Sequence, residues 1–314
     1  MFSCIHEKQE SLGCHLPRPK PRLPSSADQL LLDAAVEMKQ NPDATETAFM
    51  ARQLVQCTLP HSDPGDTPIW TRTNGNLTLV IQPHIDRQTR KAMYPYGSIP
   101  RLFLFWLVTE AKRKKSRHIR LGNSLDNFMR EIGLNPRTGG GKRGDAKRLQ
   151  EQMRRLIDAR ISFESETETH GRYLHMDVSS SAEFWWDSNK SDQENLWESW
   201  IELGEKFYEA VTLSSVPVDL RALRALKRSP LALDLYAWLT YTAFVATKAR
   251  RPRTVPWEAL HSQMGAEYAE IRMFRTNVRL ALKKIQLVYP ELKLELTSDG
   301  MTVLPSRSAI SAAS

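Results

Sequence analysis

The chain has few cysteines and lacks a long uninterrupted apolar run. Its three cysteines, Cys4, Cys14 and Cys57, lie in the first fifth of the 314 residues, where a disulfide framework would leave the remainder without cross-links. The longest apolar stretch, residues 229–246, still contains Asp234, and a bilayer span needs roughly 20 apolar residues. We expect no transmembrane helix and, since the first residues do not resemble a secretory signal, a cytoplasmic location.

Residue clusters typical of catalytic or metal sites are also missing from the sequence. The spacing of Cys4, His6, Cys14 and His15 does not match the short paired knuckles of structural zinc sites. The run TGGGKRGD is not a phosphate-binding loop, because Arg143 follows Lys142 where Ser or Thr is needed and no apolar strand leads into it. We therefore expect a protein without enzymatic activity, cofactor or metal.

Positive charge is in excess, and the positive and negative residues are concentrated in different segments of the chain. The net charge is +8 and the pI about 9.4. Residues 111–160 contain 15 Lys or Arg against five Asp or Glu, residues 161–200 contain two against nine, and residues 221–284 contain 13 against four. Two basic blocks separated by an acidic one indicate two surfaces for a polyanionic partner, whereas ordinary solvated helices would mix the signs throughout.

Turn signals and hydrophobic periodicity divide the chain into three parts. Residues 1–75 are expected to be largely flexible, with one helix at 27–39, and a strand is expected at 77–83. Residues 76–198 are expected to form the first domain, and residues 199–314 the second. In the first domain the pattern predicts, in order, a helix at 100–114, a strand at 118–121, helices at 124–132 and 145–159, and a hairpin of strands 160–166 and 172–178.

The second domain is predicted to repeat this order. After a helix at 220–226, the expected elements are a helix at 231–245, a strand at 253–255, helices at 257–264 and 267–288, and a hairpin of strands 292–296 and 301–303. The predicted fold class is therefore α+β, with tandem winged-helix domains, each a helix-turn-helix backed by a β-hairpin wing, after a flexible N-terminal segment.

Two helices present a polar stripe apart from their apolar stripe, as a helix that enters the DNA major groove would. In the second domain the stripe is wholly basic. In the first domain, a basic strand and a basic loop precede the helix that carries the stripe. The candidate DNA-binding residues of the first domain are Arg117, His118, Arg120, Arg137, Lys142, Arg143, Lys147, Arg148, Gln152 and Arg155, with Arg154 as a further phosphate contact. Those of the second are Lys248, Arg250, Arg251, Arg253, Arg272, Arg275, Arg279 and Lys283.

Several stretches carry a family resemblance. The run from YPYGSIPRLFLFWLV to RLIDARISFE, followed by SPLALDLYAWLTYTAFVA and RPRTVPWEALHSQMGAEY, resembles the plasmid-encoded RepA replication initiators of Gram-negative bacteria, over roughly residues 94–305. The resemblance implies binding of double-stranded plasmid origin DNA at repeated sites (iterons), melting of an adjacent AT-rich segment, recruitment of the host initiator and replicative helicase, and a part in copy control. It implies no individual base contact.

Other functions remain open at this point. A transcriptional repressor of similar fold, acting on its own gene, would share every feature above. A nucleic-acid enzyme such as a relaxase or primase would need a metal-ligand cluster, which none of the eight tyrosines adjoins. A third alternative is an interaction protein whose basic faces bind acidic partners. Homodimerisation is also open, and the strand at 200–203 with the Trp-rich acidic segment before it is the candidate movable part.

Overall fold

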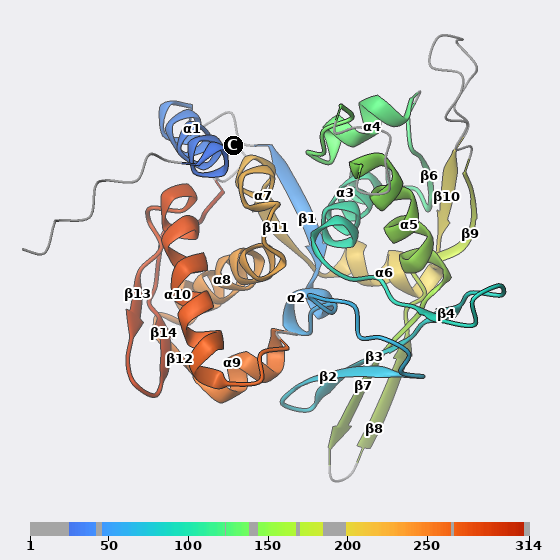
Figure 1. Ribbon diagram of the computed structural model, residues 1–314. Helices are drawn as coiled ribbons and strands as arrows, with labels where there is room; N and C mark the ends of the chain where they lie inside the picture. Colours follow the sequence, from blue (N-terminus) through green and yellow to red (C-terminus); the bar gives the residue numbers. More distant parts are fainter. Residues whose placement is uncertain are drawn as a thin grey trace, which may run out of the picture.

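The structure is a computed structural model that describes residues 25–41, 46–122, 124–137, 144–167, 170–184, 199–264 and 267–310. Within these ranges the chain forms ten α-helices and small antiparallel sheets, a mixed α+β fold (Figure 1). None of these helices is both long and apolar enough to span a membrane.

One half of the molecule contains a helix, a strand, two helices and two further strands in that order. They are α3 (Ser98–Lys114), β6 (His118–Arg120), α4 (Leu125–Glu131), α5 (Asp145–Asp158), β9 (Ser179–Glu183) and β10 (Trp200–Leu203). β10 lies between β6 and β9 in an antiparallel sheet. Ser124 caps α4, and Gly133 follows it with φ of 80°, a conformation that favours glycine.

The other half repeats both the element order and the strand order. It contains α8 (Pro230–Ala249), β12 (Arg253–Pro256), α9 (Trp257–Gln263), α10 (Ile271–Val288), β13 (Leu294–Leu296) and β14 (Gly300–Val303). Here β14, the last strand, lies between β12 and β13. The two halves occupy opposite sides of Figure 1.

The hairpin predicted directly after α5 forms, but it belongs to a different sheet. β7 (Arg160–Thr167) and β8 (His170–His175) pair with each other, and β7 also pairs with β3 (Leu77–Gln82), which in turn pairs with β2 (Trp70–Asn74). β6 pairs instead with β10, beyond the 198/199 boundary that the sequence predicted. That boundary therefore cuts through a sheet, because β10 lies far along the chain from its partner β6.

The N-terminal part of the chain is more ordered than the sequence indicated. α1 (Ser26–Gln40) begins with a capping box and contacts α7 (Leu220–Leu226) and α10. β1 (Thr47–Ala51) pairs with β11 (Ser215–Asp219), and α2 (Arg52–Gln56) follows it. Described residues in the range expected to be flexible thus contribute helices, strands and buried side chains, including Cys57, to the fold.

The core runs through both halves. α3 and α8 are apolar on more than one face, so each must be covered on several sides. α8 contacts α10, β11, α2 and α3, whereas α3 contacts β1, α5 and α6 (Glu205–Leu213). The short pair β4 (His84–Ile85) and β5 (Ala92–Met93) lies at the edge of this core, against which Ala92 packs. Because α3 and α8 also touch each other, the two halves share one packed centre.

Candidate nucleic-acid interface

The basic stripe on α10 is accessible as predicted. Arg272, Arg279 and Lys283 are exposed, and Arg275 is half-buried. Phe274, Val278, Ala281, Leu282, Ile285 and Val288 form the buried face. None of the four basic side chains forms an ion pair with any residue that the structure describes. Four like charges along one helix face repel each other, and no ion pair with a described residue offsets this repulsion. An anionic partner would relieve it.

Arg275 differs from the other three because it contacts an aromatic ring. Its guanidinium carbon lies 5.4 Å from the ring centroid of Trp257, the first residue of α9. Trp257 is almost fully buried. Sequence reasoning did not single out Trp257, because its contact with α10 joins two helices and follows no periodicity within either.

A second group of exposed cations follows α8. Lys248, Arg250, Arg251 and Arg253 are all exposed. The backbone of this turn is hydrogen-bonded, since Arg250 N and Arg251 N donate to carbonyls in the last turn of α8. Arg253 belongs to β12, which pairs with β14. The side chains therefore project from a defined backbone rather than from a loop without hydrogen bonds.

The corresponding turn in the first half has the same spacing. Lys115 ends α3 with φ of 51°, and Arg250 ends α8 with φ of 52°. In both halves the strand begins three residues later, at His118 and at Arg253. Sequence reasoning missed the exposed Lys115, although the equal spacing between helix end and basic strand could have identified it.

The predicted stripe on α5 needs a correction. Gln152 and Arg155 are only 7% and 8% exposed. The Oε1 atom of Gln152 accepts a hydrogen bond of 2.9 Å from Tyr96 N, and Arg155 Nη1 donates to Tyr94 O at 3.1 Å. These side chains hold the segment before α3 against α5, so they are not available to DNA.

Other residues of α5 keep a free surface. Lys147, Arg148 and Arg154 are exposed. Arg148 lies 3.4 Å from Asp145, and Arg154 lies 3.6 Å from Asp158, in exposed pairs of the kind that contribute little. Among the other candidates of this half, Arg137 is exposed, while Lys142 and Arg143 lie outside the described residues.

The basic strand β6 is partly neutralised by its neighbour. Arg117 and His118 both face Glu202 of β10, at 3.6 Å and 3.4 Å, and the His118 ring lies 5.1 Å from that of Trp200. Arg120 is exposed and has no ion pair within the described ranges. β10 thus supplies a carboxylate beside the predicted basic strand.

The described residues offer little for metal or thiol chemistry. No group of three His, Cys, Asp or Glu side chains lies close enough to hold a metal within them, and Cys4, His6, Cys14 and His15 fall outside the described ranges. Burial raises the pKa of Cys57 to about 12, so this thiol stays protonated at neutral pH.

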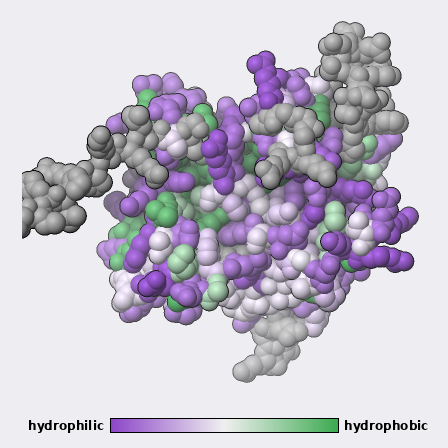
Figure 2. Space-filling view, in the orientation of Figure 1, coloured by the Kyte–Doolittle hydropathy of each residue, from purple (hydrophilic) through white to green (hydrophobic). Residues whose placement is uncertain are grey.

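The visible face of the molecule is mostly hydrophilic (Figure 2). Figure 2 shows hydrophilic side chains over most of the visible surface and smaller hydrophobic areas over α8, α10 and the β12–β14 sheet. On α10 the exposed apolar side chains are Met273, Leu280 and Leu287, spaced by seven residues. They form a second exposed stripe beside the basic one.

Basic helices and strands on a polar surface, in a mixed α+β fold, are typical of proteins that bind nucleic acid. The family of plasmid-encoded RepA proteins matches residues 94–259, slightly more than half of the chain. The chain belongs to this family, which supports a role in the initiation of plasmid replication. The match includes α5 and the turn after α8 but ends before α10.

No curated protein matches the chain. A crystal structure of RctB domains 2-3 is similar with a TM-score of 0.48 and 12% sequence identity, over 80% of this chain and 96% of that one.

Proposed function

We propose that the chain initiates plasmid replication by binding repeated sites in the plasmid origin as duplex DNA, with α10 and α5 as the two reading helices. The observation that carries the proposal is the stripe Arg272, Arg275, Arg279 and Lys283 on one helix, which is exposed except for the half-buried Arg275 and has no ion pairs to described residues. Arginines in that arrangement suit guanine edges and phosphates. Beside them, Met273 and Leu280 suit thymine methyl groups.

We also propose that each half is a winged-helix domain. The support is that β6, β10 and β9 follow the same strand order as β12, β14 and β13, each around a helix, strand, helix, helix unit. In such a unit the third helix enters the major groove while flanking strands and loops touch the backbone. The first domain would then extend to β10. The residues before α3 would pack against both domains.

Origin melting and recruitment of the host initiator and helicase are the further steps of this proposal. Family membership supports them, and the cationic surface supports only the first contact with DNA. Each phosphate neutralised by Lys or Arg releases counterions, so the affinity should fall steeply with salt.

The test is quantitative binding to a duplex that carries the plasmid's own origin repeats and to a random duplex of equal length, at several salt concentrations. We expect tighter binding to the repeats by at least about 1000-fold and a protected pattern at helical-turn spacing in footprinting. Equal affinity for both duplexes would refute origin recognition. A replication assay with an origin fragment then separates an initiator from a repressor.

A further inference from the structure

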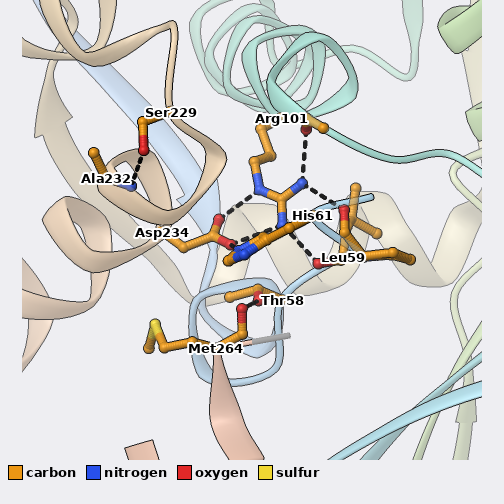
Figure 3. Close-up of polar contacts among 10 residues, drawn as sticks. Thr58, Leu59, His61, Arg101, Ser229, Ala232, Asp234 and Met264 are labelled. Carbon is orange, nitrogen blue, oxygen red and sulfur yellow. Dashed lines mark hydrogen bonds and ion pairs between the residues drawn. The ribbon is translucent and has the colours of Figure 1, made fainter. Parts of the chain in front are cut away.

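Residues 57–67, here called the strap, run between the two halves and are held by both. Thr58 Oγ1 donates a buried hydrogen bond of 2.7 Å to Met264 O, just after α9 in the second half. From the first half, Arg101 of α3 donates to Leu59 O at 2.6 Å and to Pro60 O at 3.0 Å. Figure 3 shows this arrangement. The strap therefore touches the two halves within three consecutive residues.

A buried ion pair joins the halves beside the strap. Arg101 Nε and Nη2 each lie 2.7 Å from the carboxylate of Asp234 on α8, and His61 Nε2 lies 2.8 Å from the same carboxylate (Figure 3). Arg101 is 2% exposed and Asp234 8%. Burial by itself would raise the pKa of Asp234, but Arg101 and His61 outweigh it and lower that pKa. The contacts with Arg101 and His61 therefore keep the buried Asp234 carboxylate ionised.

Two neighbouring strap residues contact α5 and the segment that leads into α10. Ser62 Oγ donates to Glu267 Oε2 at 2.6 Å, shortly before α10, and Trp70 Nε1 donates to the other oxygen at 3.3 Å. Asp63 Oδ2 accepts from Arg155 Nη1 of α5 at 3.3 Å. One short segment thereby connects the residues just before α10 to α5.

We propose that the strap fixes the spacing and rotation between α5 and α10, and so selects the spacing of the two base blocks that one molecule reads. This inference rests on the proposed function. Two reading helices joined rigidly gain a high effective concentration only for sites whose geometry matches theirs. Domains joined by a small polar interface would instead move against each other. Here the halves share a packed centre at α3 and α8, and the strap and the ion pair add polar contacts that oppose rotation about it.

The DNA test uses the full chain and a duplex that the wild-type chain itself enriches from a random pool. Five base pairs, about half a helical turn, are inserted between its two footprinted blocks. We expect the insertion to weaken wild-type binding about 100-fold. The double variant Asp63→Ala, Glu267→Ala leaves the buried ion pair intact and should reduce this penalty to about 10-fold or less. Glu270→Ala, an exposed glutamate outside the strap contacts, is the matched control and should keep the full penalty.

A second measurement needs no DNA. Spin labels are placed on cysteines introduced at Arg154 and Gln286, with Cys4 and Cys14 changed to serine, and the distance distribution between α5 and α10 is recorded. We expect one narrow distribution for the wild-type strap and a broader one for the double variant. Equal widths, or an insertion penalty that the double variant retains while it stays folded, would overturn the inference. A wild-type chain that enriches no sequence from the pool would instead refute the proposed function.

Discussion

The guanidinium of Arg275 on α10 lies over the ring of Trp257 on α9, 5.4 Å from its centroid. The indole face holds the arginine by a cation–π contact and restricts its rotamers. Arg279, one turn further along, is exposed and has no such contact. Of these two arginines, only Arg275 is therefore held by a ring contact with another described side chain.

This difference leads to a prediction for the stripe. Arg275→Ala and Arg279→Ala should each cost about 1 to 3 kcal/mol in binding to the origin repeat if the side chains read bases. Only Arg275→Ala should also lower the free energy of unfolding, by about 0.5 to 1 kcal/mol. Titrations with labelled duplex and urea unfolding measure the two effects. Equal losses on origin and random duplex would mean that the side chains touch phosphates only.

Arg275→Lys is the matched control for this contact. Lysine keeps the positive charge but lacks the planar group that stacks on an indole and pairs with guanine in two hydrogen bonds. We expect it to recover binding to random duplex more fully than binding to the origin repeat. Full recovery on both would contradict a stacked, base-reading role.

For Gln152 we expect a loss of stability and not of DNA affinity. Gln152→Leu leaves the buried N–H of Tyr96 without its acceptor, which should cost about 1 to 3 kcal/mol of unfolding free energy. Lys147→Ala, on the exposed face of the same helix, should behave in the opposite way: weaker DNA binding with unfolding changed by about 0.5 kcal/mol at most. If folded Gln152→Leu lost specific binding while Lys147→Ala did not, the assignment of the two faces would be reversed.

The contrast between α10 and α5 shows what the sequence could reveal. On α10 the 3.6-residue period separates the buried Phe274 from the exposed Arg272, and in the basic stripe of the second face only Arg275 is half-buried, against α9. On α5 the same reasoning predicted a free stripe, but Tyr94 and Tyr96 cover Gln152 and Arg155 from more than 50 residues away in sequence. Periodicity reports which residues share a face, and it does not report what packs on that face.

Sheet pairing was unpredictable for the same reason. The sequence predicts β7 and β8 as a hairpin because a short turn joins them. The partner of β6, however, is β10, and the partner of β1 is β11, and both pairings join distant parts of the chain. Such pairings depend on tertiary packing. Tertiary packing also orders the segment before β2, although the composition of that segment resembles a loop.

Asp234 should be among the most sensitive positions for stability. Asp234→Asn leaves Arg101 buried without a counter-charge, so we expect a loss of about 3 to 5 kcal/mol in unfolding free energy, measured from urea midpoints. Asp158→Asn removes the partner of Arg154 in an exposed pair and should cost about 1 kcal/mol or less. Similar costs at the two positions would show that the buried pair adds nothing to what an exposed pair contributes.

His61 makes the stability depend on pH in a defined window. Burial lowers the pKa of His61 below its usual 6.5, although the hydrogen bond to Asp234 opposes this shift. At neutral pH the ring is therefore uncharged, and its Nε2–H donates to the Asp234 carboxylate, which can only accept. The unfolded chain binds the proton more readily than the folded chain, so the free energy of unfolding should fall as the pH drops below about 6.5.

The measurement is a series of urea unfolding curves between pH 7.5 and pH 5, a range that brackets the ordinary histidine pKa of about 6.5. His61→Gln cannot take up a proton and retains an N–H donor for Asp234, so its stability should vary less over this window than that of the wild type. His175→Gln, at an exposed position, controls for the loss of an imidazole. The lowered pKa of Asp234 affects stability only near and below pH 3.8, its ordinary pKa. It therefore does not contribute to the pH dependence between pH 5 and pH 7.5. If His61→Gln and the wild type lost stability in parallel from pH 7.5 to pH 5, the slope would have to come from another group, and His61 would be protonated as easily in the folded chain as in the unfolded one.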